Sequence, residues 1–208
     1  MPTVYPAPYN LSFTAASLRP ELARIVAEHY LAAGDWATAK SQILASNALQ
    51  ARSPASGIRL ERELRQRIER LSEPQLRLLA GSTGDDRAAM AWLAAMKQNA
   101  LVFELASEVL RDKLDGHDTS LRPSDYEGFL ASMSTEHPEI LALAETTRTK
   151  VRRVLLRMLT EAGILTKGAA LGELQRPVMS MNADRAIRAD NARWLAGFLL
   201  SDAEITRT

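Results

Sequence analysis

An all-α, compact multi-helix globular fold is the prediction here, and three observations support it. The 208 residues are 46% hydrophobic and 25% charged, which is the balance of an ordinary soluble globular chain. Aromatic residues make up only 5%, whereas Ala, Leu, Arg and Glu, which favour helices, are abundant. Strand signal is nearly absent, and only residues 171–179 (LGELQRPVM) suggest a short β-arm.

Four helices are predicted in the first 80 residues, and a capping residue or a proline begins each of them. Gly34 ends the first helix and Asp35 caps the second, so residues 18–48 should form a helical hairpin. The third helix should run to about residue 71. The predicted starts are Ser17 with Pro20, Asp35, Ser53 with Pro54, and Ser72 with Pro74.

The second part of the chain begins with the best linker candidate, GSTGDD at 81–86. The following stretch is apolar on more than one face and should form buried helices with a break at Asn99. A polar loop at 115–124 should come next. Three further helices are expected, at 126–133, at 139–162 before Gly163, and at 178–200. We therefore expect two helical lobes, residues 1–80 and 81–208, that pack as one globular unit.

The charges are sorted along the chain, although they nearly cancel to +1 overall. Residues 1–80 hold 10 basic and 7 acidic side chains, residues 81–145 hold 5 and 12, and residues 146–208 hold 11 and 6. An acidic middle therefore separates two basic ends.

The first basic helix, within residues 54–71, has one apolar face and one face rich in arginine. A solvated face would need internal pairs such as Glu61 with Arg65 and Glu63 with Arg67. These pairs leave several cations mostly without a matching acid, but on this helix alone a solvated face is the slightly better interpretation, and the second basic segment changes that balance. The candidate contact residues on and before this helix are Arg52, Arg59, Arg62, Gln66 and Arg70.

The second basic segment, TTRTKVRRVLLRMLTEAG at 146–163, has no acid between Glu145 and Glu161. Threonine hydroxyls and cations that alternate on a helix suit phosphate oxygens and base edges, as on a helix in the major groove. Each basic helix follows a hairpin or turn, which indicates helix-turn-helix-like units. The candidate contact residues here are Thr149, Lys150, Arg153 and Arg157.

Several blocks also resemble the small helical BrxA family of BREX (bacteriophage exclusion) systems. They are YNLSFTAASL at 9–18, GDW at 34–36, NALQARSPASGIRLERELRQRIERL at 47–71 and TTRTKVRRVLLRMLTEAGIL at 146–165. The resemblance implies an all-helical, cytoplasmic and non-enzymatic protein of prokaryotic phage defence, with a proposed DNA-binding role and a basic groove. Members have at times been labelled inner-membrane proteins, a label that the hydropathy here does not support.

The block at 47–55 has two interpretations. Ser53-Pro54 could bind a phosphate at the free N–H groups of the next helix, but capping is the better interpretation for Asn47 and Ser53. Arg52 lies in the turn and is harder to explain structurally, so it is a preferred contact residue.

No pattern in the sequence predicts an enzyme, a cofactor or a metal site. There is no cysteine, and the three histidines have no ligand spacing. His29 is expected to be packed or capped. Walker, GxGxxG and GxSxG motifs are absent. No secretion signal and no uninterrupted apolar run of about 18 residues occurs, so we expect no membrane contact.

Core packing is the expected role of Trp36, Trp92 and Trp194. Two alternatives stay open for Tyr5 and Tyr9, which could cover the core as an N-terminal arm or reach a partner.

Two functional classes follow from these patterns. The first is a protein that binds double-stranded DNA through phosphate contacts with little sequence specificity. The second is an adaptor that holds other BREX proteins through the acidic middle or an apolar helix face. The better candidate surface is the acidic segment with Asp112, Asp115, Asp118 and Asp125. The DNA-binding class is preferred. The oligomeric state is left open, with a monomer favoured.

Overall fold

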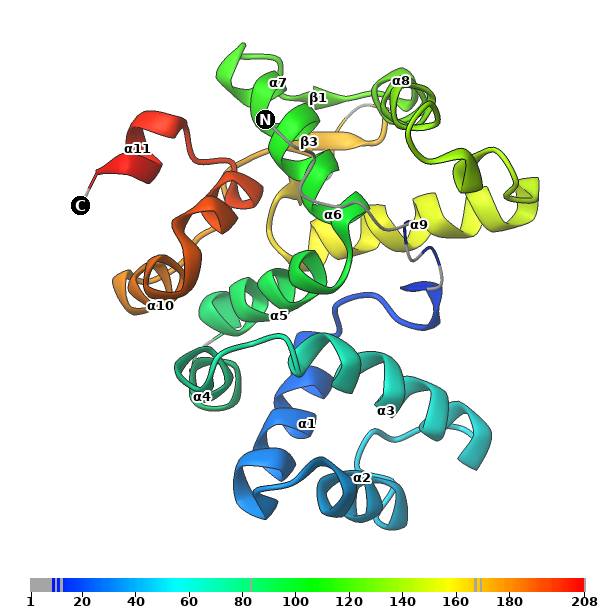
Figure 1. Ribbon diagram of the computed structural model, residues 1–208, viewed down its shortest axis with the longest axis vertical. Coiled ribbons are helices and arrows are strands. Elements are labelled where there is room, and N and C mark those ends of the chain that lie inside the picture. The colour runs from blue at the N-terminus through cyan, green and yellow to red at the C-terminus, as the bar shows by residue number, and fades with distance from the viewer. Residues whose placement is uncertain are drawn as a thin grey trace.

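The regular secondary structure of the described residues is almost entirely helical, as predicted (Figure 1). The computed structural model describes residues 9, 11, 13–82, 84–166, 168 and 170–207. The α-helices are α1 (Pro20–Ala33), α2 (Trp36–Ala45), α3 (Pro54–Ile68), α4 (Glu73–Gly81), α5 (Gly84–Gln98), α6 (Ala100–Glu104), α7 (Arg111–Asp115), α8 (Pro123–Met133), α9 (Glu145–Glu161), α10 (Met181–Asn191) and α11 (Asp202–Thr206). Shorter helical turns are η1 (Phe13–Ala15), the π-helical η2 (Leu105–Leu110), η3 (Pro138–Ile140) and η4 (Ala192–Phe198).

Local capping explains where the first helices begin and end. Gly34 adopts a left-handed conformation (φ 77°) that closes α1. Asp35 then caps α2 by accepting the N–H of Thr38 at 2.8 Å. Ser53 begins α3 through a reciprocal capping box with Ser56. These predicted helix boundaries are confirmed.

Helix α5 lies at the centre of the molecule, where it packs against α1, α3 and α4 on one side and α6, α10 and η4 on the other. Trp92, Leu93 and Met96 of α5 are completely buried. The indole N–H of Trp92 donates to the carbonyl of Gly197 at 2.9 Å, so its one polar atom is satisfied. The core is therefore continuous from α1 to η4.

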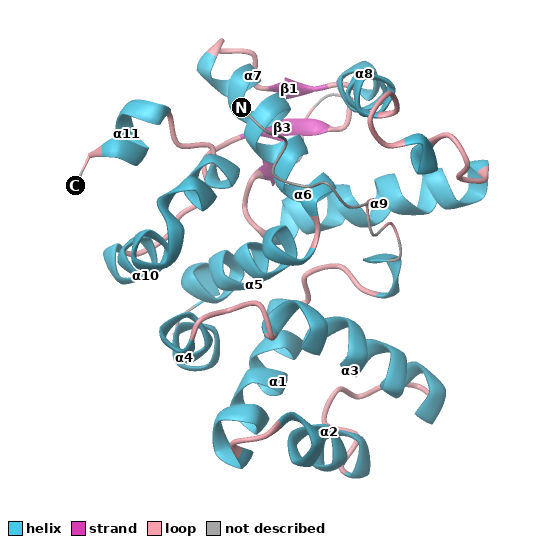
Figure 2. Cartoon of the chain, viewed as in Figure 1, coloured by secondary structure: helices cyan, strands magenta, loops and turns pink. Residues whose placement is uncertain are grey.

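The strands form one small sheet beside α7 and α8 (Figure 2). Its strands are β1 (Ser120–Leu121), β2 (Leu165–Thr166) and β3 (Gly172–Leu174), in the order β1-β3-β2 with antiparallel pairing. The predicted β-arm is thus present at its first residues only, and residues 175–180 lead to α10 without strand structure. Both partners of β3 come from segments that were not predicted as strands.

Two predicted helices are shorter than expected. The helix expected from residue 139 begins only at Glu145, because η3 and a turn at 141–144 precede it. The Arg148 side chain stabilises this turn by donating to the carbonyls of Ile140 and Leu141, both at 3.2 Å. The helix expected at 178–200 begins only at Met181 and is divided into α10 and η4. Its break is at Asn191, whose side chain accepts the N–H of Arg193 at 3.0 Å and competes with the helix.

Tyr9 covers the core, which decides one of the open alternatives. Its ring stacks on His137 with centroids 3.6 Å apart, its hydroxyl donates to Glu104, and its backbone N–H donates to Glu139 at 2.7 Å. Burial raises the pKa of Tyr9 and also that of Glu104. Tyr5 lies outside the described residues.

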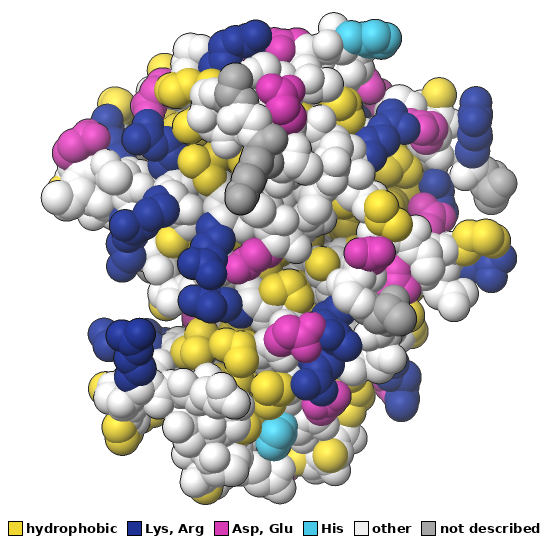
Figure 3. Space-filling view, turned by 180° about the vertical axis from the view of Figure 1, so that it is seen from behind, with side chains coloured by type: hydrophobic (Ala, Val, Ile, Leu, Met, Phe, Trp, Pro, Cys, Tyr) yellow, Lys and Arg dark blue, Asp and Glu magenta, His cyan; other side chains and the backbone are white. Residues whose placement is uncertain are grey.

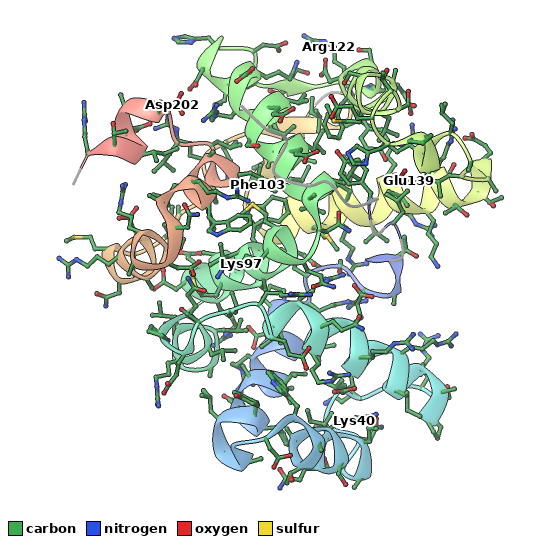
Figure 4. All side chains as sticks on the ribbon, viewed as in Figure 1. Lys40, Lys97, Phe103, Arg122, Glu139 and Asp202 are labelled. Carbon is green, nitrogen blue, oxygen red and sulfur yellow. The ribbon has the colours of Figure 1, made fainter. Side chains whose placement is uncertain are left out.

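The packing role predicted for the tryptophans is confirmed. Trp36 stacks on Tyr30 with ring centroids 3.9 Å apart, and the rings of Trp194 and Phe103 form a T-shaped pair with centroids 4.9 Å apart. Figure 4 shows Phe103 between α6 and the C-terminal helices. His29 is satisfied by the carbonyl of Ile25 at 2.8 Å.

Candidate nucleic-acid interface

The arginines of α3 divide into a buried and an exposed set. Arg65 pairs with Glu61 at 2.9 Å and Arg67 with Glu63 at 2.6 Å, so both predicted pairs are present. Glu69, four residues after Arg65, pairs with it as well, at 2.6 Å. These pairs use up the acids of the helix.

Arg67 belongs to the structure of the protein and not to its surface. Its side chain is only 4% exposed and donates to the carbonyls of Ala16 and Ser17 at 2.8 and 2.7 Å. Burial lowers the pKa of Arg67. Arg67 therefore holds the segment before α1 against α3 through these hydrogen bonds.

The predicted contact residues on α3 and just after its end are all exposed: Arg59, Arg62, Gln66 and Arg70. Within the described part of the chain, Arg59 and Arg62 have no hydrogen-bond or ion-pair partner. Arg70 is different, because its Nε donates to Gln98 at 2.9 Å and its carbonyl accepts from Lys97 at 3.1 Å. Arg70 is thus tied to the end of α5.

The cations of α9 divide in the same way. Arg148 is held by the backbone of the turn before the helix, and Arg152 pairs with Glu127 of α8 at 3.3 Å. The predicted contact residues Thr149, Lys150, Arg153 and Arg157 are all exposed. Arg157 is paired with Glu161 at 3.1 Å, whereas Lys150 and Arg153 have no partner among the described residues.

A groove of about 760 Å³ brings the two basic helices together. Arg52 and Arg59 reach it from the α3 side, Lys150 from α9, and Arg19 from the start of α1. Leu22, Leu49 and Leu60 form part of its apolar surface. In Figure 3, Lys and Arg side chains lie on both sides of an indentation at the left edge of the molecule, where α3 and α9 face each other.

A second hollow of about 180 Å³ continues this surface along α9. It is lined by Arg153 and Arg157, and it shares Arg19 and residues 14–16 with the groove. The structure therefore brings together Arg52, Arg59, Lys150, Arg153 and Arg157. It leaves Arg62, Gln66 and Arg70 outside both hollows, and it places Thr149 in a separate small pocket between α8 and α9.

Sequence reasoning missed two residues of the groove, Arg19 and Gln50. Both are exposed, and both have the left-handed backbone conformation that non-glycine residues seldom adopt, with φ of 49° and 50°. Neither lies on a helix face, so the helical periodicity carried no signal for them.

The turn between α2 and α3 confirms the capping interpretation. Ser53 is the N-cap of α3, and the Asn47 carboxamide accepts the N–H of Ala51 at 3.0 Å. Arg52 is exposed beside the groove, as its choice as a contact residue requires. This connection and the one between α8 and α9 are both longer than the helix-turn-helix turn of about 3–4 residues.

The acidic segment is partly neutralised by its own neighbours. Lys113 binds Asp118 at 2.6 Å and Asp125 at 3.0 Å, and Arg122 binds Asp118 at 2.7 Å. Arg122 and Lys113 hold the pKa of Asp118 well below its ordinary value. The segment therefore presents less negative charge than its composition suggests.

The described residues form neither a metal site nor a membrane-spanning helix. No set of three or more of their His, Cys, Asp or Glu side chains is arranged to hold a metal ion. No described helix is both long and apolar enough to cross a bilayer.

Comparison with known proteins identifies the family. The BrxA family profile matches residues 7–191, which includes α3, α9 and the whole of the groove. The chain belongs to the BrxA family. Membership of the BrxA family indicates a component of a BREX phage-defence system.

Two curated relatives carry the name BREX protein BrxA. The protein from Escherichia coli O9:H4 (strain HS) is 27% identical over 140 residues, which are 67% of this chain and 66% of the relative, just under two thirds of its length. The protein from Bacillus cereus (strain H3081.97) is 23% identical over 150 residues, 72% of this chain and 75% of the relative.

A solved structure shares the fold of this BrxA-family chain. It is the crystal structure of an uncharacterized protein from Magnetospirillum magneticum, with a TM-score of 0.78 and 19% sequence identity. The match covers 93% of this chain and 98% of the other.

Proposed function

We propose that this BrxA-family protein is a non-enzymatic accessory component that binds double-stranded DNA in the groove between α3 and α9. The observation that carries the proposal is the convergence of Arg59 and Lys150, from helices far apart in the sequence, on one groove in which neither has an acidic partner among the described residues. Exposed cations without a counter-charge in the protein contribute most to the free energy of DNA binding when they neutralise phosphates.

The chemistry of the groove favours the backbone of DNA over its bases. Guanidinium and ammonium groups bind phosphate oxygens, and phosphate contacts position a protein without reading sequence. We therefore expect the affinity to depend strongly on salt and little on the sequence of the duplex.

The test is fluorescence anisotropy of a labelled duplex across a salt series. For the wild type, log K should fall with log salt by about 0.9 for each phosphate neutralised. The double variant Lys150→Ala/Arg153→Ala should bind more weakly, with a slope shallower by up to about 1.8. The control Lys40→Ala/Arg185→Ala removes the same charge from exposed positions that line neither hollow, and it should keep the wild-type slope.

An adaptor role is the second candidate, with other BREX proteins as partners. Val178 and Met181 are each 69% exposed and lie before and at the start of α10, at the other side of the molecule from α3 and α9 (Figure 1). Large exposed apolar side chains that lie together are typical of protein contacts. Absence of duplex binding even at low salt would reject the DNA proposal and favour this role.

A further inference from the structure

Residues 16–19, which we call the strap, join the two helices that border the groove. The strap follows η1, and η1 contacts both α3 and α9. Leu18, in the middle of the strap, is 1% exposed and belongs to the core. The strap is therefore a fixed part of the structure and forms one border of both hollows.

Charged side chains hold the strap from both sides. From α3, the Arg67 guanidinium donates to the carbonyls of Ala16 and Ser17. From α9, the Glu161 carboxylate accepts the hydroxyl of Ser17 at 2.8 Å through Oε1 and the backbone N–H of Arg19 at 3.1 Å through Oε2. The strap thus connects a cation of one basic helix to an anion of the other.

The contact with Glu161 also supports the unusual backbone of Arg19. A residue with a side chain pays a conformational cost of about 1–2 kcal/mol in the left-handed region. The N–H of Arg19 is held by Glu161, and its carbonyl accepts the first hydrogen bond of α1 from Ala23 at 2.9 Å. This arrangement places Arg19 at the point where the two hollows meet.

Glu161 has the wrong charge for a DNA-binding surface. Its carboxylate lies beside the predicted contact residue Arg157 and binds it at 3.1 Å, so it both repels phosphate and occupies a cation. By charge alone, removal of Glu161 should strengthen DNA binding.

We propose that Glu161 is a positioning residue that sets the spacing of the two basic helices through the strap, so that DNA binding depends on it despite its negative charge. This inference rests on the proposed function. Glutamine at this position keeps one oxygen for the N–H of Arg19, and its NH₂ group can donate to the Ser17 hydroxyl instead of accepting from it. Both attachments of the strap are then neutral hydrogen bonds, which are about half as strong as those that the carboxylate accepts.

The test compares Glu161→Gln with Glu145→Gln in the duplex titration. Both changes remove one negative charge from α9, but Glu145 is exposed and has no partner in the described part of the chain. We expect Glu161→Gln to weaken duplex binding by about fivefold. The slope of log K against log salt should become shallower by about 0.9 for each phosphate that is no longer neutralised. Glu145→Gln should bind as tightly as the wild type or slightly more tightly.

Ser17→Ala is a second variant that changes no charge. It removes the hydroxyl that Glu161 binds, so it should weaken DNA binding in the same direction. The positioning role is wrong if Glu161→Gln binds duplex as tightly as the wild type or more tightly, which is what its charge alone predicts.

A distance measurement separates this inference from the proposed function. The chain has no cysteine, so Ile58→Cys on α3 and Thr146→Cys on α9, both exposed, can carry spin labels. Glu161→Gln should shift or broaden the distance distribution between them, and Glu145→Gln should not. If the wild type binds no DNA but the distances change, the DNA proposal fails and the spacing role stands. Unchanged distances would refute the spacing role.

Discussion

The same substitution at two arginines of α3 should change two different properties of the protein. Alanine at Arg67 should lower the stability, and alanine at Arg59 should weaken DNA binding. Arg67→Ala removes a guanidinium that is 4% exposed and donates to two carbonyls and to Glu63. Breaking a buried ion pair costs about 3–5 kcal/mol, because the partner keeps its charge and loses its counter-charge. Arg59→Ala removes an exposed side chain without a partner among the described residues, which should cost less than about 0.5 kcal/mol.

Thermal unfolding measures this difference directly. In a chain of this size, about 1 kcal/mol corresponds to a change in Tm of about 2–4 °C, so Arg67→Ala should lower the Tm by about 10 °C. Arg59→Ala should leave the Tm within about 2 °C of the wild type and should weaken duplex binding. Equal decreases in Tm for the two variants would refute the division of α3 into a structural and a binding set.

Two further predictions concern buried positions. Because the folded pKa of Glu104 is raised by burial, stability associated with this group is present below its ordinary pKa of 4.5 and is lost as pH rises through the folded pKa. In urea unfolding, Glu104→Gln, which keeps an acceptor for Tyr9, should therefore be more stable than the wild type at pH 8 and as stable as the wild type at pH 4. A variant that is as stable as the wild type at both pH values would contradict this prediction. Gly172→Ala should destabilise the protein by about 2 kcal/mol or more, because Gly172 has φ of 138° and a Cβ there would lie 2.5 Å from the carbonyl oxygen of Thr166. An unchanged midpoint of urea unfolding would contradict this, because it would mean that the sheet accommodates the added methyl group.

The predictable parts of the fold are those that local chemistry determines. Gly34, Asp35 and Ser53 act within one helical turn of their own positions, and their roles follow from the sequence. The pairing of β3 with residues 120–121 and 165–166 depends on contacts between distant segments, so sequence patterns indicate β3 alone and not its partners. The break before Glu145 has the same cause, because Arg148 holds a turn that contains no strong helix breaker of its own.

The candidate site was predictable as two faces but not as one surface. Helical periodicity placed the predicted contact residues of α3 and α9 at exposed positions, and exposure is a property of a single helix. Which of them meet is a property of tertiary packing. Lys150 joins Arg59 at the groove, whereas Arg62 and Arg70 lie on or beside the same helix as Arg59 and do not. The left-handed residues Arg19 and Gln50 complete the surface from loops, where no periodic pattern exists.

The near-neutral charge of the chain limits how DNA binding can work. A net charge of +1 gives no general attraction to a polyanion, and charges separated by more than about 8 Å are screened at physiological salt. Affinity must then come from the few cations that meet the phosphates directly. Internal pairing supports this focus, because Lys113 and Arg122 neutralise acids of the middle segment and the acids of α3 bind Arg65 and Arg67. Among the described residues, the cations at the groove that have no partner are few, so their spacing matters more than their number. A residue that sets this spacing can therefore outweigh its own unfavourable charge.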